Sequence, residues 1–228
     1  MVKKNKTVTK NIYLLSASSN FDWIKYDHYN YKQPYVNSLP KHILFEKDSI
    51  KMMGYTQDAI KDFLITNDIN NGDSYALTQK YLSFKIERDK NDWHTMEGGG
   101  FLFNILYKNK KISGYCILVT QGGLRLYELK NIDAQSFSDG KNGNISKIGK
   151  LLGQYNIGDV LSQHKISMRV TNNNVSLWSD DKIIMDNYKL PREYGYDFGP
   201  ITSHSKHDCR QQSFFTFSDI QMSSSCEK

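Results

Sequence analysis

The sequence predicts an all-β protein, an antiparallel β-sandwich with at most one or two short helices. From about residue 80 onward, apolar and polar residues alternate in short runs, as they do in strands with one buried face. Turn-forming residues separate these runs at short intervals, which is typical of sandwiches and barrels. Strands that alternate with long helical patterns are missing, so the sequence excludes a doubly wound α/β fold.

The first strongly alternating run, 81–88, places its apolar residues on one side and its polar residues on the other. A lysine-rich turn at 108–111 and the glycine pair at 122–123 then mark the connections between neighbouring strands. The strands predicted in this part of the chain after the first span 100–109, 113–121 and 123–130.

The segment 164–190 predicts three strands joined by two tight hairpins, at 172–174 and 179–181. Asn and Asp fill these turns, and both residue types tolerate the positive φ that two-residue hairpins require. The last predicted strand, 213–222, carries apolar residues that need cover. These are Phe215, Phe217 and Ile220.

The best helical candidate is the segment 55–64. Thr56 can cap a short helix there, and Ile60, Phe63 and Leu64 fall on one helical face.

The 228 residues fit one domain, since sandwiches of this length often remain undivided. Hydrophobic residues make up 39% of the chain and aromatic residues 13%, enough for a sizeable core. No linker or internal repeat divides the sequence. We expect a disordered basic leader at 1–10, a single sandwich at 11–222 and a flexible tail at 223–228.

The formal charge of +6 raises the question of nucleic-acid binding. Four of the basic residues are lysines within the first ten residues, which leaves 26 basic against 24 acidic side chains in the remainder. Nucleic-acid binding usually needs a focused basic patch, and a balanced surface with a basic tail does not provide one. We therefore expect no nucleic-acid partner.

No stretch approaches the roughly 20 apolar residues of a membrane-spanning helix. The apolar run at 12–15 is too short for the core of a signal peptide, so either the protein is cytoplasmic or an export signal precedes this chain. Cys116, Cys209 and Cys226 are too few for a disulfide scaffold. The sequence favours Cys116 with Cys209 if one pair forms, and buried thiols are the open alternative.

Three segments carry a resemblance to a known superfamily. "GGGFLFN" at 98–104, followed by "SGYCILVTQGGLRLYEL" at 113–129, is similar to a central three-stranded meander. "HKISMRVTNNNVSLWSDDKIIMD" at 164–186 resembles its later hairpins, and "FFTFSDIQM" at 214–222 its closing strand. These segments resemble the concanavalin A-like lectin and laminin G-like jelly-roll superfamily, whereas residues 11–79 match it only loosely.

The resemblance implies a jelly-roll sandwich that acts as a binding module for glycans or protein surfaces, often in secreted or cell-surface proteins. Some members of the superfamily are glycoside hydrolases, and many bind calcium at the rim of the sandwich. Calcium is therefore the one cofactor that the resemblance suggests for this chain, and the residues themselves indicate none.

The segment 199–211 contains residue types that zinc prefers, namely His204, His207 and Cys209. A structural zinc site needs a fourth ligand, which His94, His164 or Asp208 would have to supply. Because a paired Cys-x-x-Cys is absent, we favour a loop at the rim, begun by Gly199-Pro200, that leads into the final strand.

The segment 91–97 is the second candidate site. Trp93 can stack on a sugar ring, His94 and Asp92 can bind hydroxyl groups, and Glu97 can accept hydrogen bonds or act as an acid. Taken by itself, the segment favours a structural role, in which Trp93 fills the end of the sandwich and the glycines at 98–100 let two backbones approach closely.

Catalytic patterns are weak. Retaining glycosidases need two carboxylates about 5–5.5 Å apart, and the Glu-x-Asp-x-x-Glu pattern of jelly-roll glucanases is absent. The nearest spacings, Glu87 with Asp89 and Asp180 with Asp186, fall at strand ends or turns. No nucleophile elbow, phosphate loop or dinucleotide fingerprint occurs.

We therefore expect a non-catalytic recognition module, an adhesin-like or lectin-like domain of a secreted or cell-surface protein. The alternative is a glycoside hydrolase or lyase on the same fold. If the two candidate segments meet at one end of the sandwich, they form a single site. The ligand-binding residues would then be Asp92, Trp93, His94, Glu97, His204, His207 and Arg210.

Overall fold

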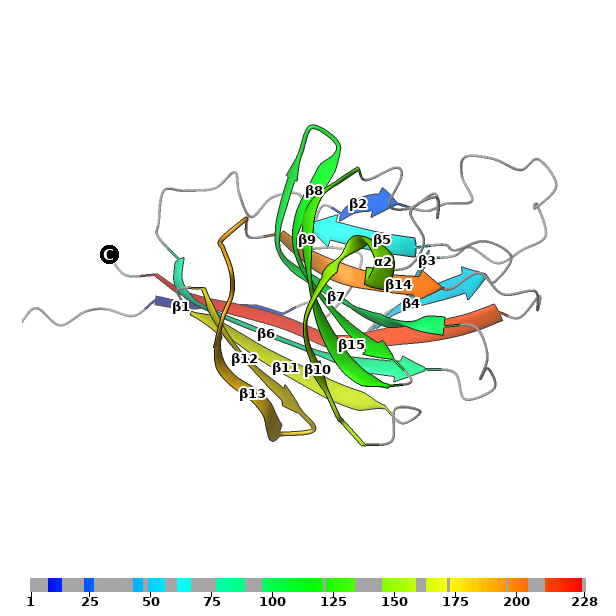
Figure 1. Cartoon of the computed structure of the whole chain (residues 1–228). Coiled ribbons are helices and arrows are strands. Elements are labelled where there is room, and N and C mark those ends of the chain that lie inside the picture. Colours follow the sequence, from blue (N-terminus) through cyan, green and yellow to red (C-terminus); the bar gives the residue numbers. More distant parts are fainter. Residues whose placement is uncertain are drawn as a thin grey trace, which may run out of the picture.

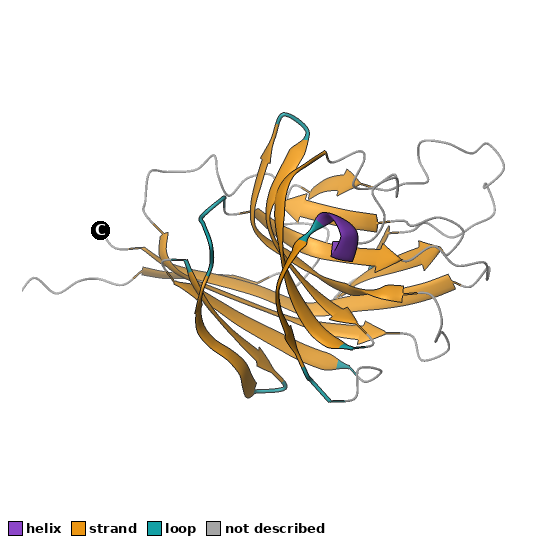
Figure 2. Cartoon of the chain, in the orientation of Figure 1, coloured by secondary structure: helices purple, strands orange, loops and turns teal. Residues whose placement is uncertain are grey.

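The protein is a sandwich of two antiparallel β-sheets that face each other (Figure 1). The computed structural model describes residues 8–13, 23–26, 43–46, 49–55, 61–66, 77–88, 96–120, 122–133, 145–158, 163–171, 173–195, 197–204 and 212–226. Nearly all of these residues lie in strands, and the helix among them is the short α2, Ile145–Ile148 (Figure 2). The prediction of an all-β sandwich is confirmed.

The first sheet, sheet A, has eight strands within the described residues, in the order β13-β12-β11-β6-β15-β4-β3, with β1 pairing on β15. Its closing strand β15 lies at the centre, between β6 and β4. The strands of sheet A are β1 (Val8–Tyr13), β3 (Ile43–Phe45), β4 (Ser49–Tyr55), β6 (Leu77–Arg88), β11 (His164–Thr171), β12 (Asn174–Ser179), β13 (Lys182–Lys189) and β15 (Gln212–Cys226).

The second sheet, sheet B, has seven strands within the described residues, in the order β10-β9-β8-β7-β14-β5-β2. The meander β7-β8-β9 lies between β10 and β14 in this sheet, and its strands are those that the alternating runs predict. The strands of sheet B are β2 (Trp23–Tyr26), β5 (Lys61–Thr66), β7 (Met96–Lys108), β8 (Lys111–Thr120), β9 (Gly123–Asp133), β10 (Lys150–Tyr155) and β14 (Asp197–His204).

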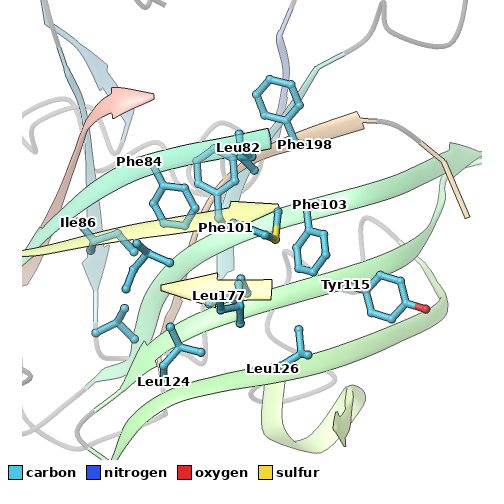
Figure 3. Packing of buried hydrophobic residues seen from close by; sticks show 14 of the residues in the cluster. Leu82, Phe84, Ile86, Phe101, Phe103, Tyr115, Leu124, Leu126, Leu177 and Phe198 are labelled. Carbon is cyan, nitrogen blue, oxygen red and sulfur yellow. The ribbon is translucent and has the colours of Figure 1, made fainter. Parts of the chain in front are cut away.

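The main core lies between the two sheets (Figure 3). Each strand of β6, β7, β8 and β9 contributes every second residue, so the period-two pattern of the sequence becomes the inner layer of the sandwich. Phe84 and Phe101 stack across the gap with ring centroids 4.3 Å apart. The buried residues labelled in the figure are Leu82, Phe84, Ile86, Phe101, Phe103, Tyr115, Leu124, Leu126, Leu177 and Phe198.

Two hairpin turns have positive φ at both central residues, as the sequence predicts for the turn at 179–181. Asp180 (φ 50°) and Asp181 (φ 64°) both adopt positive φ between the paired residues Ser179 and Lys182. Asn109 and Lys110 do the same in the β7-β8 turn. Positive φ at both central residues matches the right-handed twist of the flanking strands, so register is fixed on both sides.

The glycine run at 98–100 is explained by packing. A β-carbon on Gly99 would lie 2.5 Å from the Phe215 ring, which crosses from sheet A onto that backbone. A β-carbon on Gly98 or Gly100 would instead collide with carbonyl oxygens of β8. The prediction that the glycines at 98–100 allow close approach between two backbones is therefore confirmed.

The predicted helix at 56–64 is wrong, because residues 61–66 form strand β5. Phe63 pairs with Ile201 of β14 on one side and with Tyr26 of β2 on the other. Aromatic and β-branched residues are as suited to a strand as to one face of a short helix, and the sheet decides between them. Residues 56–60 lie outside the described part of the chain.

The predicted loop at 199–211 is wrong over its first part, because residues 197–204 form strand β14 in the middle of sheet B. Proline is rare in such a position, since it cannot donate a hydrogen bond to the ladder. Within the described residues, β5 pairs with β14 only at Ile201–Ser203. At Pro200 one edge of the strand therefore has no strand partner among the described residues, and a proline is tolerated there.

The predicted leader and tail both contribute to sheet A. Lys10 pairs with Ser224 and Val8 with Cys226, so residues 8–10 and 223–226 extend β1 and β15. The sequence does not predict this pairing, because the side chains of these residues show no strand pattern. Backbone hydrogen bonds can form whatever the side chains are.

Candidate functional site

The two segments predicted to bind a ligand are connected to neighbouring strands of sheet B. Strand β7 begins at Met96 and β14 ends at His204, and these two residues are partners in the register. The chain therefore enters β7 and leaves β14 side by side. We call this end of the sandwich the rim, and it also includes the end of β6, the start of β11, the start of β15 and the β8-β9 turn.

The structure brings two of the predicted site residues onto adjacent strands. Glu97 is the second residue of β7, and His204 is the last residue of β14. The remaining predicted residues lie outside the described part of the chain. They are Asp92, Trp93, His94, His207, Arg210 and the metal candidate Cys209.

His164, one of the suggested fourth zinc ligands, also lies at the rim, but its ring is engaged locally. Its Nδ1 is 2.9 Å from Oδ2 of Asp180, and the His164 side chain is only 5% exposed. Oδ1 of Asp180 accepts a hydrogen bond from the Lys165 amide. Burial alone would raise the pKa of Asp180, but the hydrogen bonds from Lys165 and His164 lower it on balance. Among the described residues, no group of three His, Cys, Asp or Glu side chains could hold a metal ion.

The outward face of sheet B, directed away from sheet A, is apolar across the described parts of β7, β8 and β9. Leu102, Cys116, Leu118, Tyr127 and Leu129 are all buried there in a second hydrophobic cluster, to which α2 contributes Ile145. A retaining glycosidase needs two carboxylates at alternate positions of a strand, facing a cleft. The described residues of this face supply no such pair.

The one charged residue on this face of the described β9 is Arg125, which sequence reasoning did not single out. It follows the β8-β9 turn directly and pairs with Leu118 on β8 and Gln154 on β10. The available signal was a lone charge at an outward position between two inward leucines, in the run Leu124-Arg125-Leu126.

A buried carboxylate lies at the opposite end of the sandwich. Glu128, 7% exposed, accepts a hydrogen bond from the Tyr194 hydroxyl at 2.7 Å and pairs with Arg192 Nε at 3.2 Å. Burial and the bond to Glu128 raise the pKa of Tyr194. Arg192 and Tyr194 belong to the segment that carries the chain from β13 to β14. Glu128 is thus engaged by both Tyr194 and Arg192, so we assign this network to closing the sandwich.

Cys116 is a buried thiol on β8, with Sγ 3.8 Å from the carbonyl oxygen of Ile117. Its suggested partner Cys209 lies outside the described residues. No helix in the described part of the chain is long and apolar enough to cross a membrane.

Comparison with solved structures decides the fold. A prokaryotic β-1,3-1,4-glucanase (lichenase) derived from a mouse hindgut metagenome matches with a TM-score of 0.55 and 10% identity, over 95% of this chain and 98% of that one. The fold is a lectin-like jelly roll. At this identity the likeness is one of fold alone, and it confirms the fold that the sequence resembles. No protein-family model and no curated protein matches the sequence.

Other solved structures match the jelly roll at lower TM-scores. A carbohydrate-binding module, CBM66 from Bacillus subtilis, matches with a TM-score of 0.46 and 11% identity, over 93% of this chain and 94% of that one. The carbohydrate recognition domain of Emp46p, in its metal-free form, matches with a TM-score of 0.47 and 14% identity, over 88% and 86%. A matched sialidase is much longer, and the chain spans only 16% of it.

Proposed function

We propose that this protein is a non-catalytic recognition module whose ligand is a glycan, bound at the rim. A glycan ligand further suggests an extracellular or cell-surface location, where glycans are displayed. The binding residues would be those of the segments 91–97 and 203–211, with Trp93 as the stacking platform and the polar side chains as partners for hydroxyl groups.

The observation that carries the proposal is the register pair of Met96 and His204. Two polar segments with suitable side chains are attached to these neighbouring strand ends, so both start from one place on a rigid sheet. Loops held by a rigid scaffold are where binding sites usually occur. The pairing therefore supports one composite site over two separate ones.

The chemistry of the described residues favours binding over turnover. The outward face of β7, β8 and β9 carries apolar side chains where a glycosidase would need paired carboxylates. Asp180 and Asp186, a spacing that the sequence suggests, are used locally, by His164 and Ser176 respectively. The glucanase likeness is one of fold and adds no catalytic residue.

The experiment is a glycan array run beside a pull-down from cell-surface extracts, with turnover of labelled β-glucans and galactans measured on the same protein. We expect specific, saturable glycan binding and no turnover. Capture of a surface protein without glycan binding would replace the glycan by a protein ligand. Turnover by wild type that disappears in Glu97→Gln would overturn the proposal that the protein is a non-catalytic module.

The binding site at the rim is tested with two variants, Trp93→Ala and His204→Ala. The thermal unfolding of each variant is first compared with that of wild type. Each folded variant is then titrated against the ligand that the array identifies. Loss of a stacking aromatic weakens binding by roughly ten- to a hundredfold. Trp178→Ala is the matched control, since Trp178 lies on sheet A and stacks with Arg169 there. If both rim variants are folded and bind like wild type, the ligand binds elsewhere.

A further inference from the structure

The half-buried arginine on the outward face of sheet B, Arg125, has no anionic partner among the residues that the structure describes. Nε of Arg125 is fully buried and makes no hydrogen bond, and the described residues offer Arg125 no ion pair. The other arginines with described side chains are engaged, Arg192 with Glu128 and Arg169 with the Trp178 ring at 5.7 Å. Arg125 is therefore the exception among the described arginines.

The head of Arg125 points toward the rim, to the β8-β9 turn. A β-carbon on Gly122 would lie 3.2 Å from Nη2 of Arg125 and 3.4 Å from Nε2 of Gln154. Both of these side-chain nitrogens therefore lie next to Gly122, which has no side chain of its own. Both Gly122 and Gln154 are exposed, so a ligand can reach them from solvent.

The turn beneath these nitrogens is held in place by its own hydrogen bonds. Gln154 Nε2 donates to the Gly122 carbonyl at 3.1 Å, and the Gly122 amide donates to Thr120 Oγ1 at 3.2 Å. Thr120 in turn donates to the Gly123 carbonyl at 2.9 Å. The turn and Gln154 are therefore positioned before any ligand arrives, which lowers the ordering cost of binding.

A guanidinium that is partly removed from water and unpaired favours an oxyanion, because its planar fork matches the geometry of a carboxylate or a sulfate. We propose that Arg125, with Gln154 beside it, binds the acidic group of a glycan at the rim. This inference rests on the proposed function and narrows it, since it names acidic glycans as the ligand class. The acidic group is a sugar carboxylate or a sulfate ester.

The test compares glycans that differ only in the acidic group, by isothermal titration. The probes are tetragalacturonate against its fully methyl-esterified form, 3′-sialyllactose against lactose, and a heparin-derived tetrasaccharide against its desulfated form. We expect wild type to bind at least one acidic probe about tenfold or more tightly than its neutral counterpart, in line with a charge-assisted hydrogen bond. Tight binding in the first two pairs identifies a carboxylate, and in the third a sulfate.

Arg125→Ala is expected to bind the acidic probe no better than the neutral one. Arg169→Ala is the matched control, an arginine on a central strand of the other sheet, and is expected to keep the preference. A second measurement needs no variant: raising the salt from about 0.02 to about 0.5 M should weaken acidic binding by wild type much more than neutral binding.

The outcomes separate this inference from the proposed function. Equal affinity of wild type for acidic and neutral probes, or an unchanged preference in folded Arg125→Ala, overturns the role of Arg125 while glycan binding stands. Absence of binding to every probe and to the array overturns both. A preference that disappears in Arg125→Ala and persists in Arg169→Ala supports the inference.

Discussion

The phenolic oxygen of Tyr115 lies between the two backbone groups of Arg192, donating to the carbonyl at 2.5 Å and accepting from the amide at 3.1 Å. Tyr115 belongs to β8, and Arg192 to the segment that carries the chain from sheet A to sheet B. One buried side chain thus holds the crossover against the meander, at the end of the sandwich opposite the rim.

Tyr115→Phe removes both hydrogen bonds and leaves two backbone groups of Arg192 without their partner. We expect the free energy of unfolding to fall by about 1–3 kcal/mol, measured by urea denaturation. Tyr188→Phe is the control, because Tyr188 packs on the same core but its hydroxyl bonds to no other described residue. That control should stay within about 0.5 kcal/mol of wild type. Equal stability of Tyr115→Phe and wild type would show that the two hydrogen bonds to Arg192 contribute nothing to stability.

Alkaline pH should destabilise the protein through one buried and two half-buried tyrosines. Burial raises the pKa of Tyr115, Tyr155 and Tyr194 above the usual value of 10.0. Because the folded pKa values are raised, their contribution to stability is fully present below about pH 10 and is lost as the pH rises through the folded-state values. Unfolding free energies measured between about pH 8 and pH 11 should fall, and Tyr194→Phe should flatten the slope. A slope that is the same in the variant would contradict this assignment.

Lowering the pH should reduce the stability of the protein through Asp180, which lies in the turn between β12 and β13. The folded-state pKa of Asp180 is lowered, so its contribution to stability is present above about pH 3.8 and is lost as the pH falls through the folded-state value. Asp180→Asn keeps a residue that tolerates positive φ but removes the charge beside His164. We expect a loss of up to about 1 kcal/mol at pH 7, since the carboxylate is half exposed, and a smaller difference from wild type in acid.

Asp181→Asn is the matched control for the turn. Asp181 occupies the neighbouring position with φ 64°, and its side chain is 81% exposed. Its substitution should change stability by less than about 0.5 kcal/mol at any pH. If both variants behave alike, the contact between His164 and Asp180 has no special role.

Gly99→Ala should destabilise the sandwich by about 1–3 kcal/mol, because its β-carbon would lie against the Phe215 ring. Adding Phe215→Leu to the same chain should recover part of the loss, since the smaller side chain leaves room. Gly122→Ala meets only the ends of flexible side chains and should cost much less. Thermal unfolding of these variants and of Phe215→Leu alone checks the order, and a double variant that is less stable than the sum of its parts would contradict the packing account.

The sequence predicts the second half of the fold well because its strands are long and amphipathic. The run from Leu82 to Ile86 and the hairpin at Asp180 carry both the alternation and the turn chemistry that decide a strand pair. Local pattern fails where sheet pairing overrides it. Phe63 and Leu64 fit a helix face equally well, and Pro200 indicates a loop until the pairing of β14 with β5 is seen to end at Ile201.

The candidate site is predictable only in part. The residue types at Trp93 and His204 suggest recognition chemistry from the sequence alone, but their proximity depends on the pairing of β7 with β14, across about a hundred residues of chain. Arg125 is harder to predict, because an arginine in a strand points to a binding site only once the described residues are seen to offer it no acidic partner. Which residues lie near Arg125 depends on the folded structure, so the apolar and polar pattern of the strand does not show that an acidic partner is absent.

The central place of β15 in sheet A also sets an order of assembly. Phe217 pairs with Ile86 and Ile50, so β6 and β4 are held in one sheet by a strand that is synthesised long after both. Until residues 212–226 have left the ribosome, these two strands keep one edge open, a state that invites chaperone binding or aggregation. Contacts so distant along the chain also slow folding, toward the millisecond-to-second range of all-β proteins. Truncating β15 should therefore leave a chain that collapses without forming sheet A.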